Sequence, residues 1–232
     1  MSVISAILAN LEAASLALKD FSREVVFVGG STTMLYVDDL QTADVRATYD
    51  VDFVIEVATV LEYQMAEAEM RKLGFKDDVA EDAPICRWKK GPLTVDMMPT
   101  QDKILGFSNK WYAPGFATST THKLPSGADV KIFTLPYFVA SKFEALKGRG
   151  LKKLDYSQDL EDILLLAASR ATFFDEVKSF PAEIKSHIGE VLKLARQNPS
   201  FELAVRGNLP RFLPSSRAAD IFNRLNSLPE DI

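Results

Sequence analysis

The sequence predicts an α+β protein: a mixed β-sheet with flanking helices over residues 1–134, followed by an all-helical part over residues 135–232. Two observations favour this division. The first part contains short runs in which apolar and polar residues alternate, bounded by glycine and proline turns, as in paired strands. From Pro136 onward, apolar residues recur only at helical spacing. We therefore expect two domains, for which 232 residues suffice.

The composition is that of an ordinary globular protein. Apolar residues make up 47% of the chain and charged residues 25%. The net charge of −5 gives no overall basic surface for nucleic acid, although a local basic patch is compatible with it. No apolar run approaches the roughly 20 residues of a membrane helix. The single cysteine, Cys86, excludes an internal disulfide, and we expect an inert core thiol in a cytoplasmic protein without a membrane partner.

The sheet part is predicted to alternate helices with strands. In chain order, we expect a helix over residues 3–20, a strand over 24–28, a short helix over 31–38, a strand over 50–57 and a helix over 59–73. Thr59 is suited to cap the last of these helices, and Gly74 is suited to end it. The buried stripe of that helix is expected to contain Leu61, Met65, Ala68 and Leu73.

Two hairpins complete the predicted sheet. They pair residues 85–90 with 93–98 across the turn Gly91-Pro92, and residues 117–124 with 130–133. Trp111 and Tyr112 lie between the hairpins. They either stack on a nucleobase or pack against the rest of the protein.

The helical part begins at Pro136, which fits the first turn of a helix. Further helices are expected from Ser157 and over residues 172–178, 181–196 and 215–228, with a basic linker near residues 148–153. In the first helix, Lys142 lies off the apolar stripe and is expected to be exposed. Ser157 can cap the second helix, where Asp159 in the first turn favours the helix dipole. The side chains expected to be buried in these two helices are Val139, Phe143, Leu146, Leu160, Ile163, Leu164 and Ala167.

A glycine pair, Gly29-Gly30, stands between the first strand and the short helix, and Ser31 follows it. Glycine lets the backbone approach a ligand closely. The start of a helix offers free N–H groups to a phosphate. Ser31 is either the helix cap or a direct phosphate donor. This order of elements predicts a phosphate-binding loop.

Three carboxylates accompany the loop. Alternation along a strand places Asp50 and Asp52 on one face of the sheet, and Asp96 lies in a later apolar strand. Two like charges on one partly buried face repel each other, and a bound divalent cation reverses that effect. Hard carboxylate oxygens suit Mg²⁺, and pairs of such ions clamp the reacting oxygens in phosphoryl transfer. The pattern predicts a metal site on Asp50, Asp52 and Asp96.

These residues carry a resemblance to a known family. The run from Gly29-Gly30-Ser31 through Arg46, Thr48 and Asp50-Val51-Asp52 to Val95-Asp96 resembles the nucleotidyltransferase superfamily. Within it, the chain is similar to the abortive-infection toxin type (AbiEii/AbiGii) of bacterial toxin–antitoxin systems. A second signature of that type resembles Ser141-Lys142-x-x-Ala145-x-x-x-Arg149 followed by Ser157-x-Asp159-x-x-Asp162.

The resemblance implies roles for the helical part, which would close a nucleotide cleft. Lys142 would contact the triphosphate and Asp159 would orient it, with Asp162 as the alternative acid. The residues alone favour a different interpretation, an exposed lysine and a capping acid. Arg46 is either a surface cation or a clamp near the carboxylates.

The implied activity is transfer of a nucleoside monophosphate from a nucleoside triphosphate to an acceptor hydroxyl. Two Mg²⁺ ions, or Mn²⁺ in their place, would be held by Asp50, Asp52 and Asp96. The toxin branch implies an RNA end such as tRNA, or a protein such as a cognate antitoxin, as acceptor or partner. Two alternatives remain: an antibiotic-modifying type acting on a small molecule, and a non-catalytic nucleotide-binding module. The basic residues between Lys142 and Lys153 favour RNA, whereas the acidic net charge opposes it.

Overall fold

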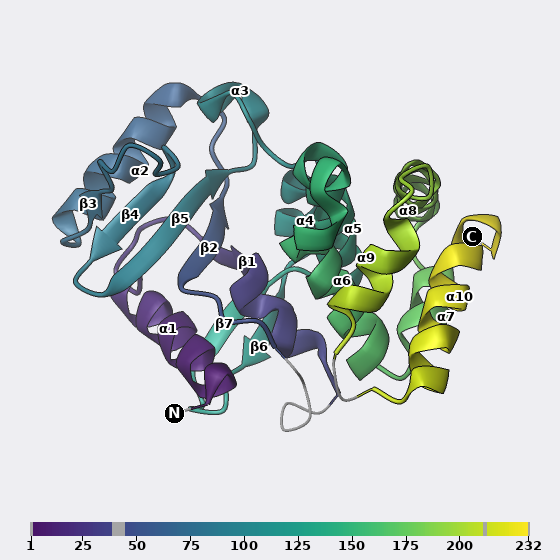
Figure 1. Cartoon of the computed structure of the whole chain (residues 1–232). Helices are drawn as coiled ribbons and strands as arrows, with labels where there is room; N and C mark the ends of the chain where they lie inside the picture. The colour runs from purple at the N-terminus through teal and green to yellow at the C-terminus, as the bar shows by residue number, and fades with distance from the viewer. Residues whose placement is uncertain (1, 39–44, 211–212, 232) are drawn as a thin grey trace. The chain divides into compact units, whose positions relative to one another are not determined.

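The computed structural model describes residues 2–38, 45–210 and 213–231 (Figure 1). The chain divides into two compact units. A sheet unit comprises Met1–Thr32 and Arg46–Thr134, and a helical unit comprises Thr33–Val45 and Leu135–Ile232. The predicted fold class is confirmed, because a mixed sheet occupies the first unit and helices form the second.

The sheet unit is built on seven strands in the order β3-β4-β5-β2-β1-β7-β6. Their bounds are β1 Val26–Val28, β2 Asp50–Ile55, β3 Lys76–Asp77, β4 Arg87–Lys90, β5 Leu93–Pro99, β6 Thr120–Lys123 and β7 Asp129–Ile132. The pairs β2–β5 and β1–β7 are parallel, and the other neighbours are antiparallel. Both predicted hairpins, β4–β5 and β6–β7, are confirmed.

Helices and helical turns complete the sheet unit. They are α1 Val3–Ala17, the 3₁₀ helix η1 Gly30–Tyr36 that leads out of the unit, α2 Val60–Lys72, α3 Asp102–Leu105 and α4 Tyr112–Ala117. Helix α1 packs on β2 and β5, as predicted, and buries Ile7, Leu11 and Ala14 (Figure 1). Trp111 is only 2% exposed, so it packs in the core and does not offer a face to a nucleobase.

Helix α2 differs from the prediction in the face that it buries. Thr59 caps it by accepting a hydrogen bond from the backbone N–H of Glu62, as expected. However, Leu61 and Met65 are 66% and 58% exposed, and the buried residues are Tyr63, Ala66 and Met70. The predicted stripe was wrong because the helix buries the face that carries Tyr63. Inside the core, the hydroxyl of Tyr63 donates a hydrogen bond to the Met97 carbonyl over 3.0 Å.

The helical unit contains α5 Leu135–Ala145, the π-helical turn η2 Leu146–Gly150, the 3₁₀ turns η3 Leu151–Tyr156, α6 Gln158–Ser169, α7 Phe173–Lys178, α8 Ala182–Ala195, α9 Phe201–Asn208 and α10 Ser215–Asp231. The predicted linker near residues 148–153 is instead helical, in η2 and η3. Helix α9 was not predicted. Its eight residues lie between Pro199 and Pro210, where proline signals favour a loop.

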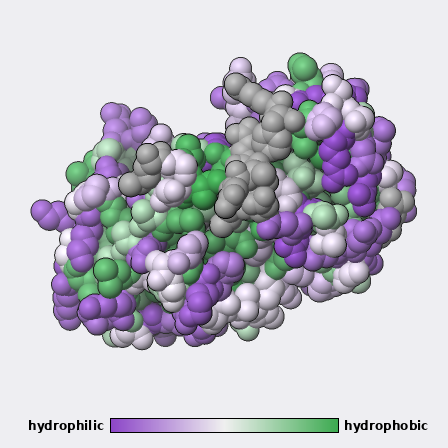
Figure 2. Space-filling model, turned by 90° about the horizontal axis from the view of Figure 1, so that it is seen from below, coloured by the Kyte–Doolittle hydropathy of each residue, from purple (hydrophilic) through white to green (hydrophobic). Residues whose placement is uncertain are grey.

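Figure 2 shows hydrophilic residues interspersed with hydrophobic ones over the face in view. Within the described ranges, no helix is both long and apolar enough to cross a membrane.

Candidate active site

Gly29 follows β1 and adopts a backbone conformation that other residues rarely adopt. Its φ is +75°, and a Cβ atom placed there would lie 1.9 Å from the Oδ2 atom of Asp52. Glycine is therefore required both by the backbone and by the neighbouring carboxylate. The predicted glycine turn and the predicted metal carboxylate thus lie in direct contact.

Gly30 lies beneath two polar side chains of the segment that leads into β2. A Cβ atom at Gly30 would lie 3.0 Å from the Nη2 atom of Arg46 and 3.1 Å from the Oγ1 atom of Thr48. Arg46 is partly buried and lies close to the glycine turn, and its role as a clamp near the carboxylates stays a prediction. Its Nη1 atom also donates a hydrogen bond to the Ala47 carbonyl over 3.2 Å.

Of the two alternatives for Ser31, the structure excludes the helix cap, and its role as a phosphate donor stays a prediction. The helix after the glycine turn is a 3₁₀ helix that begins at Gly30, so Ser31 lies within it and does not cap it. The Ser31 side chain is buried, and its hydroxyl points back to the Val28 carbonyl at 3.5 Å. The Thr32 hydroxyl likewise donates to the Gly29 carbonyl over 3.0 Å. Both hydroxyls therefore face backbone carbonyls at the start of the turn.

The three carboxylates occupy one face of the sheet. Asp52 pairs with Asp96 across the parallel strands β2 and β5, and Asp50 is two residues earlier on β2. The residues that alternate with them, Val51, Phe53, Val95 and Met97, are fully buried. The predicted alternation is confirmed, and the strand register brings the carboxylates together.

Arg87 on β4 completes this group, although the alternation of residues along single strands did not predict it. Its Nε and Nη2 atoms donate to the two carboxylate oxygens of Asp96, each over 2.8 Å. Nη2 also donates to Oδ2 of Asp50 over 2.5 Å. The hydrogen bonds to Asp96, followed by the charges of Asp96, Asp50 and Asp52, raise the pKa of Arg87, so the guanidinium stays charged.

The sequence held a signal for Arg87. The two-residue turn Gly91-Pro92 pairs Lys90 with Leu93, and counting outward along the hairpin pairs Arg87 with Asp96. Side chains at directly paired positions lie on the same face of a sheet. The predicted hairpin alone therefore brings an arginine onto the face that carries the carboxylates.

A two-metal site does not fit the carboxylates as they stand. Both oxygens of Asp96 accept hydrogen bonds from Arg87, which leaves no unshared oxygen for a second ion. Among the described residues, no three acidic, histidine or cysteine side chains are grouped so that they could hold a metal. Asp50 and Asp52 on one strand face fit a single divalent cation that takes its other ligands from phosphate oxygens.

Cys86 precedes Arg87 and points the other way, into the core. Its side chain is 3% exposed, and burial, with smaller contributions from Asp96 and Asp52, raises the pKa of the thiol to about 12. The predicted core position of Cys86 is confirmed, and a protonated, buried thiol is a poor nucleophile.

The predicted residues of the helical unit form a buried ion cluster. Lys142 on α5 is 5% exposed, and its Nζ atom donates to Oδ2 of Asp162 over 2.5 Å and lies 3.8 Å from Oδ1 of Asp159. The prediction of an exposed Lys142 was wrong. Helices α6 and α8 both pack on α5, so a position off its main apolar stripe is covered as well.

Asp159 and Asp162 have different partners. Asp162 makes the close contact with Lys142, whereas both oxygens of Asp159 accept from the guanidinium of Arg149, over 2.8 and 3.0 Å. Ser157 supplies the side-chain cap of α6, as predicted, so capping does not explain Asp159. The cluster therefore joins two cations and two buried carboxylates on three helical elements, α5, η2 and α6.

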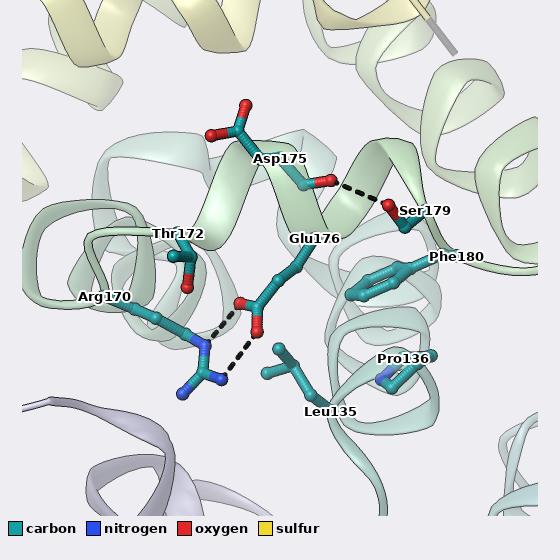
Figure 3. Close-up of a pocket in the computed structure, with 8 residues that line it drawn as sticks. All are labelled: Leu135, Pro136, Arg170, Thr172, Asp175, Glu176, Ser179 and Phe180. Carbon is teal, nitrogen blue, oxygen red and sulfur yellow. Dashed lines mark hydrogen bonds and ion pairs between the residues drawn. The ribbon is translucent and has the colours of Figure 1, made fainter.

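One pocket described in the helical unit is separate from this cluster, because no residue of the cluster lines it. Its volume is about 510 Å³, and it is lined by Leu135, Pro136, Arg170, Thr172, Asp175, Glu176, Ser179 and Phe180 (Figure 3). The Arg170 guanidinium forms two hydrogen bonds to the Glu176 carboxylate, over 2.5 and 2.7 Å. None of the predicted site residues lines it.

Comparison with known proteins gives a fold. Neither a protein-family model nor a curated protein matches the sequence. Among solved structures, a nucleotidyltransferase-like antigenic protein from Paracoccidioides brasiliensis matches with a TM-score of 0.50 and 17% identity, over 88% of this chain and 94% of that one. The fold is nucleotidyltransferase-like.

Two proteins from H. pylori also match. One is a candidate nucleotidyltransferase, with 13% identity over 98% of this chain and 90% of that chain. The other is JHP933, with 12% identity over 98% of this chain and 88% of that chain. The TM-score is 0.47 for each. At these identities the likeness concerns the fold, and membership of the AbiEii type stays a prediction.

Proposed function

We propose that this protein is a nucleotidyltransferase that moves a nucleoside monophosphate from a nucleoside triphosphate to an acceptor hydroxyl. The observation that carries the proposal is the contact between Gly29 and Asp52. It joins a glycine turn, where a phosphate can approach the backbone, to a strand face bearing Asp50, Asp52 and Asp96.

Each part of this arrangement has a use in phosphoryl transfer, which depends on positioning and charge neutralisation. A divalent cation, Mg²⁺ or Mn²⁺, bound by Asp50 and Asp52 would neutralise charge on the phosphates. Arg46, held close to Gly30, provides a fixed guanidinium of the kind that binds phosphate oxygens. Asp96 accepts from Arg87, so its predicted role as a metal ligand would require Arg87 to release it.

Lys142 and Asp159 enter the proposal through the family resemblance. In this structure both are buried in the ion cluster of the helical unit, so contact with a triphosphate would require the cluster to exchange partners. Their roles toward the nucleotide remain predictions.

The proposed acceptor is an RNA end such as tRNA, or a protein hydroxyl, in a toxin–antitoxin system with a cognate antitoxin. The basic residues between Lys142 and Lys153 are a weaker argument for RNA than the sequence suggested. Lys142, Lys147 and Arg149 each pair with a carboxylate, and only Lys152 and Lys153 remain as exposed cations without a described acidic partner.

The test is a labelling experiment. The protein is incubated with each of the four α-³²P nucleoside triphosphates in turn, with Mg²⁺ and a cell extract, and the products are separated into RNA, protein and small molecules. We expect label in the RNA or protein fraction with one nucleotide. The isosteric variant Asp52→Asn should abolish this labelling. Absence of label from both the RNA and the protein fraction, or equal labelling by the variant, would contradict the proposal.

A further inference from the structure

Arg87 is held at the carboxylates by the fold itself. The flanking residues Cys86 and Trp88 are 3% and 1% exposed, so alternation along β4 turns Arg87 onto the opposite face, toward Asp96. The paired register of β4 and β5 sets Arg87 directly opposite Asp96. A side chain placed by two paired strands is more precisely positioned than one on a loop.

The contact between Arg87 and Asp96 has the geometry of a bidentate ion pair. The guanidinium forms two parallel hydrogen bonds with Asp96, and one of its nitrogens also reaches Asp50. A planar guanidinium matches a carboxylate in this bidentate way, and it is less strongly hydrated than an ammonium. The Asp96 and Arg87 side chains are only 9% and 24% exposed, so water screens this contact weakly.

A second divalent cation would have to compete with this arrangement. It would need the same Asp96 oxygens that Arg87 occupies, and it would bring two positive charges next to a third. With Arg87 in place, by contrast, the mutual repulsion of the acidic side chains is already partly offset.

We propose that the Arg87 guanidinium acts as a built-in cation that replaces a second metal ion at Asp96, so that the carboxylate face binds at most one divalent cation. The inference concerns the charge balance of the sheet face. It stands whether or not the chain transfers nucleotides, so its test measures metal binding and stability, and a failed labelling experiment leaves it intact.

The test removes the guanidinium and asks whether a metal takes its place. Arg87→Met retains an unbranched side chain without charge. Mn²⁺ binding by the nucleotide-free protein is counted by equilibrium dialysis, and melting temperatures are recorded in Mn²⁺, in EDTA and in NaCl at matched ionic strength. The matched control is Arg71→Met, which removes an arginine that pairs with Asp77 at the exposed edge of the same sheet.

We expect Arg87→Met to melt about 5–10 °C below the parent protein in EDTA, because it leaves Asp96 unpaired. It should bind one more Mn²⁺ per chain than the parent, and Mn²⁺ but not NaCl should restore most of the lost melting temperature. The double variant Arg87→Met/Asp96→Asn should lose the additional ion and melt higher in EDTA than the single variant.

Three results would overturn the inference. They are binding of two Mn²⁺ per chain by the parent protein, no additional Mn²⁺ on Arg87→Met, and equal rescue by NaCl. Should Arg87→Met fold poorly in EDTA, recovery of folded protein in Mn²⁺ replaces the melting comparison, and Arg87→Gln is measured beside it. Poor folding of both variants in Mn²⁺ as well as EDTA would also contradict the inference.

Discussion

Gly29 and Asp52 depend on each other at the scale of single residues. The absence of a side chain at Gly29 makes room for the Asp52 carboxylate, and the positive φ of Gly29 turns the chain from β1 into η1. Sequence patterning predicted both residues as members of the site. It could not predict their contact, which arises because the antiparallel pairing of β1 and β2 places Val28 opposite Asp52.

Gly29→Ala tests this dependence. Any side chain at a positive φ costs about 1–2 kcal/mol. At Gly29 the clash with Asp52 should add about 1–3 kcal/mol of overpacking to that cost. The control is Gly127→Ala, where φ is +91° and no atom lies within 4 Å of the added Cβ. Urea unfolding of both variants should show the larger loss at Gly29, and equal losses would refute the predicted clash.

Arg87 belongs to the same site as the three carboxylates, but the sequence pattern did not identify it. Strand alternation along one segment identifies which residues share a face, and this sufficed for Asp50, Asp52 and Asp96. Finding Arg87 required the register between two strands as well. A charged residue in a hairpin also has a simpler interpretation, an exposed cation, as Lys89 and Lys90 beside it illustrate.

At the scale of elements, the cluster formed by α5, η2 and α6 changes the expected effect of a lysine substitution. Lys142 and Asp162 have side chains only 7% and 6% exposed, so removal of either charge leaves the other buried without its closest partner. The periodicity of α5 predicted its apolar stripe correctly. It could not show that two neighbouring helices cover the polar flank, because packing between helices is not encoded in the period of one helix.

Lys142→Met should therefore destabilise the protein by about 3–5 kcal/mol, the range for breaking a buried ion pair. The control is Lys147→Met in η2, which follows α5. Lys147 pairs with Glu190 at the surface, so little change is expected. Thermal and urea unfolding of both variants provide the comparison. The double variant Lys142→Met/Asp162→Asn should recover part of the loss, because the unpaired carboxylate is then neutral. A loss at Lys142 no larger than that at Lys147 would contradict the buried pair.

At the scale of the whole molecule, the chain enters the helical unit twice. The segment after the glycine turn joins it before the chain returns to the sheet at β2, and residues from Leu135 onward form the rest. Contacts 134 residues apart hold the first passage in place: the Arg170 guanidinium donates to the Tyr36 carbonyl over 2.9 Å. Tyr36 also stacks on Phe138, with ring centroids 4.3 Å apart. The local pattern of apolar and polar residues cannot predict contacts between residues so far apart in the chain.

Glu176 makes this anchoring sensitive to acid. The hydrogen bond from Arg170, followed by the charge of Arg170, lowers the pKa of the Glu176 carboxyl below its ordinary value. A carboxyl with a lowered pKa in the folded state stabilises the protein above its unfolded pKa of about 4.3, and this contribution is lost as the pH falls through the folded value. We therefore expect Glu176→Gln to be less stable than the parent near neutral pH, with the difference shrinking below about pH 4.3.

Urea unfolding of both proteins across this pH range measures the difference directly. The control is Glu202→Gln, which removes a carboxylate paired with Arg206 within one exposed helical turn and should change stability little at any pH. Loss of the Glu176 contribution should also loosen the hold of Arg170 on Tyr36, because the same guanidinium makes both contacts. Hydrogen exchange of amides in residues 33–38 should then be faster in Glu176→Gln than in the parent near neutral pH. A stability difference that is unchanged by acid would show that the Arg170–Glu176 pair does not anchor this passage of the chain.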